Sequence, residues 1–260
     1  MKVIVCIKQV PDTNEVRLDQ ETGTLIREGV PSIINPDDKA GLEAALRLKD
    51  KHGAHVLVMT MGPPQADVAL REALAMGADE AVLLTDRAFA GADTWATSST
   101  LASAIKQYDY DLIITGRQAI DGDTAQVGPQ LAERLDIVNI SYAEEINIEG
   151  GHVVVKRQYE DRYHIIKAKM PCLITALSEL NEPRYMTPGG IFKAYNEIEI
   201  KTVVRDELDV ADENIGLSGS PTRVAKSFTK PVKGQGTVVT LDDQESATWL
   251  VDKLKEKFIL

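Results

Sequence analysis

Residues 116–129 read GRQAIDGDTAQVGP and lie where the hydrophobic pattern changes from that of a strand to that of a helix. Before them, the apolar run Asp111–Thr115 predicts a buried strand. After them, Val127, Leu131 and Leu135 share one helical face. The stretch is therefore a strand-to-helix junction of an α/β pattern. Such junctions lie at the carboxyl ends of parallel strands, where open sheets bind their ligands.

Two interpretations of this stretch are about equally favoured by its residues. Glycines and short polar residues let backbone N–H groups approach a phosphate, and a helix amino terminus adds unpaired N–H groups. The stretch is not a Walker A loop, because no Gly-Lys-Ser or Gly-Lys-Thr ends it, and the chain has no G-x-G-x-x-G. The alternative is an Asp121-Gly122 turn, with Asp123 or Thr124 as the cap of the next helix.

Strand-like and helix-like segments alternate along the chain up to about Leu135, where the pattern changes. Val3–Ile7 and His55–Met61 predict strands, and Asn35 followed by Pro36 predicts the start of a helix. A later hairpin is predicted around Gly150-Gly151. The alternation indicates an α/β, Rossmann-like fold, with a mostly parallel sheet flanked by helices and a C-terminal extension.

The composition of the chain disfavours several classes of partner and site. The 260 residues carry a net charge of −11, which disfavours nucleic acid and anionic membranes as partners. The two cysteines, Cys6 and Cys172, form no C-x-x-C motif and the four histidines are scattered, so we predict buried thiols and no metal site. No run of 18 apolar residues occurs, and Lys8 interrupts the first apolar run. We therefore expect a cytoplasmic protein without membrane insertion.

Several ordered segments resemble one known family. They are VIVCIKQVPD at 3–12, INP at 34–36 followed by EAALRLK at 43–49, MGP at 61–63, ALAMGAD at 73–79 and LNEPRY at 180–185. Together with residues 116–129, they resemble the β subunit of the electron-transfer flavoproteins. Within the loop, Asp121–Pro129 is most similar to the anaerobic, electron-bifurcating members.

The resemblance implies an adenine nucleotide alpha hydrolase-like version of the fold and a cofactor site for FAD, or for AMP in the non-bifurcating members. It places Cys6, Asn35 and Met61 at the adenine and ribose. It assigns phosphate binding to backbone around Ala119, Gly122, Ala125, Gln126 and Val127. The other candidates of the same loop are Gly116, Arg117, Gln118, Asp121, Asp123 and Thr124. Arg117 is the nearest cation, although a surface role is as consistent with the sequence.

A second loop, GADTWATSS at 91–99, precedes another helical stripe. Asp93, Thr94 or Thr97 can simply cap that helix. The functional alternative is that Thr94 and Thr97 give hydroxyl groups to the diphosphate or ribityl chain of the cofactor. Neither loop carries a nucleophile–base set, so no catalytic residue is assigned and the chemistry is left to the cofactor.

The family also implies partners. Residues 1–195 are predicted to form the nucleotide- and FAD-binding domain, and residues 196–260 to form an arm that packs on an α subunit. An arm that packs on the domain of its own chain is equally consistent with the sequence. Tyr185–Lys193 corresponds to the loop that docks an acyl-CoA dehydrogenase, with candidate contacts Met186, Pro188, Ile191 and Phe192. The usual leucine anchor is absent there, and Pro188 stands near its place. In bifurcating relatives NADH donates electrons, and ferredoxin or flavodoxin is a second acceptor.

Residues 157–165, RQYEDRYHI, depart from the family pattern. Typical members have two glycines where Asp161 and Arg162 stand, and an acidic or amide residue where His164 stands. A half-buried strand position for His164 is favoured over a proton relay. Two alternative functions remain at this point: a carrier whose β subunit holds only AMP, and a universal-stress-like nucleotide-binding module without a redox role.

Overall fold

A computed structural model describes residues 1–12, 17–18, 25–26, 31–222, 234 and 236–259. The chain divides into two compact units, Met1–Ala225 and Lys226–Leu260. Each unit is described by itself.

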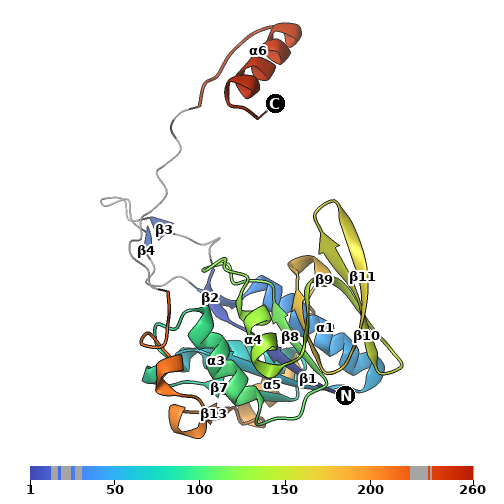
Figure 1. Cartoon of the computed structure of the whole chain (residues 1–260), viewed down its shortest axis with the longest axis vertical. Coiled ribbons are helices and arrows are strands. Elements are labelled where there is room, and N and C mark those ends of the chain that lie inside the picture. Colours follow the sequence, from blue (N-terminus) through green and yellow to red (C-terminus); the bar gives the residue numbers. More distant parts are fainter. Residues whose placement is uncertain (13–16, 19–24, 27–30, 223–233, 235, 260) are drawn as a thin grey trace. The chain divides into compact units, whose positions relative to one another are not determined.

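The first unit is built on a nine-stranded sheet with the order β11-β10-β9-β12-β8-β1-β6-β7-β13 (Figure 1). All neighbouring pairs from β9 to β13 in that order are parallel, and the β9–β10 and β10–β11 pairs are antiparallel. The α/β, mostly parallel architecture predicted from the sequence is confirmed. The strands are β1 Lys2–Cys6, β6 His55–Met61, β7 Glu80–Leu84, β8 Leu112–Gly116, β9 Val138–Glu149, β10 His152–Tyr159, β11 Arg162–Lys169, β12 Cys172–Ala176 and β13 Lys201–Val203.

Helices cover both faces of this sheet. Alternate residues of β1 point to opposite faces, so Val3 and Val5 belong to one apolar cluster and Ile4 to the other. The first cluster contains residues of α1 (Pro36–His52), α2 (Asp67–Met76) and α5 (Pro188–Asn196). The second contains residues of α3 (Thr94–Ile105) and α4 (Val127–Leu135). The result is a three-layer α/β unit with a core on each side of the sheet.

The order of the strands creates a topological switch point at β1. From β1 the chain proceeds to β6 and β7 on one side, and then returns to β8 on the other side of β1. Ligands of open α/β sheets bind outside the carboxyl ends of the strands at such a place, so the ends of β1 and β8 are the candidate site, called the switch-point crevice below. Both strands are buried. Val5 lies one residue before the end of β1 and pairs with Ile114, which lies two residues before the end of β8.

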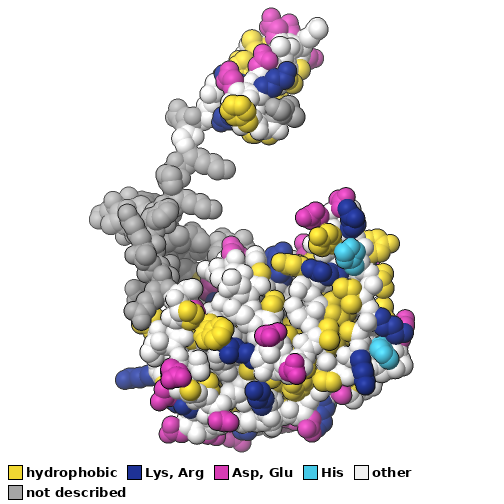
Figure 2. Space-filling view, in the orientation of Figure 1, with side chains coloured by type: hydrophobic (Ala, Val, Ile, Leu, Met, Phe, Trp, Pro, Cys, Tyr) yellow, Lys and Arg dark blue, Asp and Glu magenta, His cyan; other side chains and the backbone are white. Residues whose placement is uncertain are grey.

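The far edge of the sheet is the predicted hairpin. β9 and β10 are joined by Gly150 and Gly151, whose φ angles of 54° and 77° only glycine adopts readily. Hydrophobic side chains on the right of Figure 2 lie over this part of the sheet, and Tyr163 and Ile165 of β11 are about 60% exposed. His164 lies in β11, as predicted for a strand residue, but it is exposed and not half-buried, and its ring stacks on Tyr159.

Two short pairs lie outside the main sheet. β2 (Gln9–Pro11) pairs antiparallel with β5 (Ser32–Ile34), and β3 (Arg17–Leu18) with β4 (Leu25–Ile26). None of the described helices is long and apolar enough to span a bilayer.

The boundary between the units lies later than the predicted division at 195/196. β13 extends the sheet beside β7, and Leu208 and Ile215 are buried in the cluster under α3. These contacts place the chain after residue 196 in the first unit.

The second unit contains α6 (Asp243–Glu256), whose first turn is capped by the Asp242 carboxylate at 2.8 Å from the Glu245 nitrogen. No residue of α6 is buried.

Candidate functional site

A buried carboxylate joins the two strand ends at the switch point. Asp38, on the first turn of α1, accepts a hydrogen bond from the Lys8 N–H at 2.8 Å and another from the Gly116 N–H at 2.9 Å. Lys8 follows β1, and Gly116 ends β8. A Cβ at position 116 would overlap the Asp38 carboxylate, so only glycine fits there. Burial raises the pKa of Asp38 to about 7, although the N–H donors oppose that shift.

Asn35 connects the same helix to the loop after β8. As predicted, α1 begins at Pro36 with Asn35 as its N-cap residue, but the side chain makes no capping bond. Instead its amide nitrogen donates to the Gln118 carbonyl at 2.8 Å, and its amide oxygen accepts from the Ile120 N–H at 3.0 Å. The side chain is fully buried. Asn35 therefore fixes the base of the loop that was singled out in the sequence.

The loop itself combines a turn with strained backbone. The N–H groups of Gly122 and Asp123 both bond the Ala119 carbonyl, so the predicted Asp121-Gly122 turn is present. Asp123 and Ala125 have φ angles of 49° and 53°, a region that residues other than glycine seldom adopt. Each costs roughly 1–2 kcal/mol, and such strain concentrates at ligand sites. Gly122 is not among the strained positions, and a Cβ there would meet open space.

Helix α4 begins at Val127 with Gln126 as its N-cap residue and no side-chain cap. The alternative prediction, with Asp123 or Thr124 as the cap, is therefore wrong. Ala125 is left-handed and Gln126 is right-handed, with φ −112° and ψ −27°. Consecutive residues of opposite hand turn successive N–H groups toward one point, which is an anion-binding arrangement. No described residue accepts a hydrogen bond from the N–H groups of Ala125, Gln126 or Val127. The first turn of α4 can therefore receive the oxygens of a phosphate.

Gly128 makes this turn possible. A Cβ on Gly128 would lie 2.6 Å from Thr175 Cγ2 and 2.7 Å from Thr115 Oγ1. Because both neighbours lie at the ends of strands, a larger residue would push the helix terminus away from the sheet. Gly122 and Gly128, which both look like phosphate-loop glycines in the sequence, thus have different roles within this chain.

Among the described residues, two cations lie at the loop, and both are paired. The Lys8 ammonium lies 2.7 Å from each oxygen of the Asp121 carboxylate. The Arg117 side chain lies beside Asp37 instead of facing the loop, with Nε 3.3 Å from Oδ2. Neither of those two atoms has a well-aligned hydrogen-bond partner, and burial raises the pKa of Asp37 against the effect of Arg117. Lys8 is therefore a cation that contacts the loop directly, through Asp121.

The 91–99 loop contributes one contact to this site and one structural cap. Asp93 caps α3 by accepting from the Ala96 N–H at 3.0 Å, and its other oxygen accepts from the Thr222 hydroxyl at 2.7 Å. It is thus used within the fold. Thr94 donates to the Gln126 side chain at 2.9 Å, which brings the two predicted loops together. Thr97 lies in the first turn of α3 and is half-buried.

Cys6 and Met61 end neighbouring strands, with Cys6 in register with Met59. Burial, assisted by the nearby Asp38 carboxyl, raises the pKa of Cys6 to about 12, and burial raises that of Cys172 to about 11. Both thiols are free and buried, as predicted. Met61 is half-buried at the edge of the crevice.

The candidate partner residues form an exposed group on another part of the first unit. Tyr185 and Phe192 are 94% and 59% exposed, and Met186 and Ile191 are about 40% exposed. Pro188 is the first residue of α5, whose cap is the Thr187 hydroxyl. The loop is therefore not tucked into the core, and it presents an apolar surface.

Sequence reasoning missed Lys8, Asp37 and Asp38. Acidic residues are common in the first turn of a helix because they interact favourably with the helix dipole. The presence of Asp37 and Asp38 there therefore did not indicate a functional site. Only the spatial closeness of the β1 and β8 ends shows that Asp38 bridges them.

Comparison with known proteins agrees with this geometry. The electron transfer flavoprotein domain model matches residues 22–207. The chain is 58% identical over 257 residues to the electron transfer flavoprotein subunit beta of Clostridium acetobutylicum, covering 99% of both chains. It is 56% identical over 263 residues to the caffeyl-CoA reductase–Etf complex subunit CarD of Acetobacterium woodii, covering 100% of both chains. It is 46% identical over 267 residues to the acryloyl-CoA reductase electron transfer subunit gamma of Anaerotignum propionicum, again covering 100% of both chains. The chain therefore belongs to the electron transfer flavoprotein family, among its beta subunits.

Proposed function

We propose that this chain is the small subunit of a heterodimeric electron-transfer flavoprotein and that the switch-point crevice holds the adenosine diphosphate half of an FAD. One observation carries the proposal: the largely exposed loop 121–126 leads to free N–H groups at the start of α4, which lies beside the ends of β8 and β12, and Asp121 of the loop contacts Lys8 after β1. In a chain with a net charge of −11, such backbone donors are the suitable ligands for a diphosphate.

Each part of the crevice has a role in this proposal. Backbone around Ala119, Gly122 and Ala125–Val127 holds the phosphates, and Thr94 orients the Gln126 side chain beside them. The half-buried strand end at Met61, the buried Cys6 and Asn35 border the adenosine. When bound, FAD supplies reversible one- and two-electron chemistry, while the protein positions the ring and tunes its potential.

The favoured physiological role is flavin-based electron bifurcation. In this role the complex oxidises NADH and delivers electrons both to ferredoxin or flavodoxin and to an acyl-CoA dehydrogenase. Its support is the similarity of Asp121–Pro129 to bifurcating members, together with relatives named as parts of caffeyl-CoA and acryloyl-CoA reductase systems. The second candidate is a carrier that holds AMP in the same crevice, since the adenosine phosphate half is common to both ligands. Family membership disfavours a universal-stress-like module.

We also assign the surface of Tyr185–Phe192, called the docking segment below, to contact with the acyl-CoA dehydrogenase. The second unit, with its unburied α6, is assigned to the α subunit. The complex is expected in the cytoplasm.

Counting cofactors in the purified heterodimer tests these proposals. Two FAD per heterodimer, with absorbance that NADH bleaches anaerobically within seconds, is the result expected for bifurcation. One FAD together with one AMP, and no reduction by NADH, would leave the plain carrier. A heterodimer without flavin would overturn the electron-transfer assignment.

A further inference from the structure

The chain that leads from the sheet to the docking segment is fastened along helix α1. After β12 it passes the amino end of α1, where the Ser178 N–H donates to Asp37 Oδ1 at 3.1 Å. One turn further, the Asn181 amide donates to the Ala40 carbonyl at 3.2 Å. It then reaches Glu43, about one more turn along the same helix. We call Ser178–Arg184 the strap.

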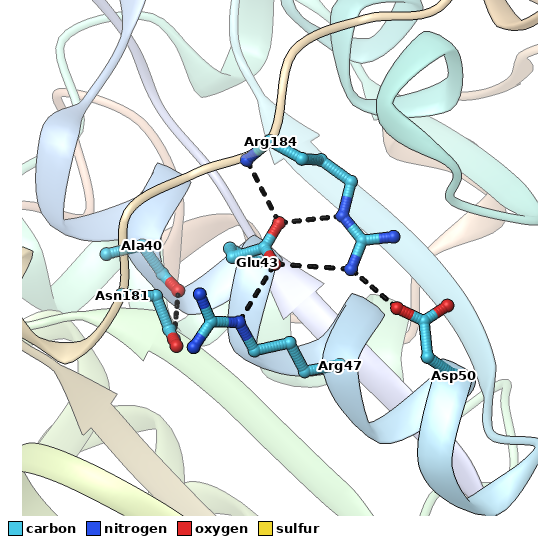
Figure 3. A network of polar contacts seen from close by, with 6 residues as sticks. All are labelled: Ala40, Glu43, Arg47, Asp50, Asn181 and Arg184. Atoms are coloured by element: carbon cyan, nitrogen blue, oxygen red, sulfur yellow. Dashed lines mark hydrogen bonds and ion pairs between the residues drawn. The ribbon is translucent and has the colours of Figure 1, made fainter.

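The strap ends at a buried carboxylate (Figure 3). The Glu43 side chain is 4% exposed, and its Oε2 accepts from the Arg184 backbone N–H at 3.1 Å and from Arg184 Nε at 2.8 Å. Its Oε1 accepts from Arg184 Nη2 at 3.2 Å and from Arg47 Nε at 3.0 Å. Arg184 Nη2 also donates to Asp50 at 2.7 Å. Four donors on one buried carboxylate fix both the side chain and the backbone of Arg184.

The docking segment begins at the next residue. Tyr185 is 94% exposed, and the chain then enters α5, which is held on α2 by a second arginine. Arg71 of α2 donates to the Ala194 and Ile198 carbonyls. Gly190 lies so close to the Ala75 carbonyl that a Cβ there would overlap it. The apolar residues Met186, Ile191 and Phe192 thus lie between two anchors, Glu43–Arg184 before them and Arg71 after them.

We propose that Glu43 and Arg184 are positioning residues that hold the docking segment in the conformation that its partner dehydrogenase recognises. A surface loop that must be ordered on binding loses affinity, whereas a loop ordered beforehand does not. The Glu43 contact with the Arg184 backbone fixes the chain direction immediately before Tyr185. This inference rests on the proposed docking function of Tyr185–Phe192.

The experiment uses the full heterodimer. The dithionite-reduced heterodimer donates electrons to a purified acyl-CoA dehydrogenase that the wild type reduces, and the rate is measured against dehydrogenase concentration. Glu43→Gln and Arg184→Lys should raise the half-saturating concentration about tenfold, with an unchanged maximal rate and flavin content. Hydrogen exchange should speed up at the amides of 184–187.

Two further variants separate positioning from general stability. Asp79→Asn weakens the Lys49–Asp79 ion pair, which ties α1 to the chain before β7 and in which the cation is as exposed as Arg184 but the carboxylate is less buried than Glu43, and it should leave the half-saturating concentration unchanged. In Arg184→Met, the buried Glu43 carboxylate loses its bonds to Arg184. The double variant E43Q/R184M also removes the charge of that carboxylate, so its melting temperature should exceed that of Arg184→Met while its half-saturating concentration stays raised.

The outcomes distinguish the two levels of the proposal. If Phe192→Ala leaves the half-saturating concentration unchanged, the docking assignment itself falls, and this inference with it. If Phe192→Ala raises it but Glu43→Gln and Arg184→Lys do not, docking stands and the positioning role is overturned. The positioning role is equally overturned if Asp79→Asn has the same effect as Arg184→Lys.

Discussion

The Asp38 carboxylate lies 2.9 Å from the backbone nitrogen of Gly116, and this contact holds helix α1 against the end of β8. The same carboxylate bonds the backbone after β1, so one buried side chain sets the spacing of the two strand ends beneath the phosphate loop. Because a buried carboxylate is costly to ionise, the stability of this contact should depend on pH.

Asp38→Asn should flatten the pH dependence of stability. The folded pKa of Asp38 is raised to about 7, above the ordinary value near 3.9, so the folded chain binds this proton more tightly than the unfolded chain. Its contribution to stability is therefore present at low pH and is lost as the pH rises toward 7, by on the order of 2–4 kcal/mol. Urea midpoints at pH 5, 6.5 and 8 measure this slope. Asp206→Asn, at an exposed carboxyl, should keep the wild-type slope.

The two loop glycines should respond differently to substitution. Gly128→Ala places a methyl group against Thr115 and Thr175 and should cost about 1–3 kcal/mol of stability. A Cβ at position 122 meets open space, so the melting temperature of Gly122→Val should stay close to that of the wild type while flavin occupancy falls through blocked backbone approach. Normal flavin content in Gly122→Val would contradict phosphate binding by this turn.

Arg184→Ala should destabilise the first unit by about 3–5 kcal/mol at pH 7, because it leaves the buried Glu43 carboxylate with Arg47 alone. Burial opposes ionisation of Glu43, but the hydrogen bonds from Arg184 and Arg47 outweigh it and lower its pKa. The stabilisation is therefore present above the ordinary glutamate pKa and declines as the pH falls below about 4. Thermal melts at pH 7 and pH 4 should show a smaller difference between variant and wild type at the lower pH.

Both cysteines should be inert in the folded chain. Burial raises the pKa of Cys6 to about 12 and that of Cys172 to about 11, and the thiolate is the reactive form. Titration with a disulfide reagent at pH 8 should detect no thiol in the native protein and two after denaturation. A thiol that reacts within minutes in the native state would show that the strand ends open.

Hydrogen exchange should divide the C-terminal region at the observed boundary. In the isolated chain, amides of β13 should be protected because this strand joins the sheet, and α6 should exchange fast because none of its residues is buried. Addition of the α subunit should protect α6. Strong protection of α6 in a monomeric isolated chain would count against an obligate partner.

The sequence alone predicted the layered α/β fold, because hydrophobic period and glycine-rich turns are local properties. Asn35-Pro36 marks the start of α1, and Gly150-Gly151 marks the hairpin, since each depends only on backbone preferences of neighbouring residues. The loop 116–129 was found in the same way, from a strand followed by a helix stripe.

The tertiary structure alone decided which polar side chains serve the site and where the first unit ends. Asn35 uses its amide on the loop and not on its own helix, and Asp38 joins strands that are more than 70 residues apart in the chain. Leu208 and Ile215 lie among a few scattered apolar residues in a charged segment without a clear helix or strand periodicity, so the sequence pattern did not predict that they are buried. Such roles depend on contacts between distant parts of the chain, and local sequence patterns carry no information about those distances.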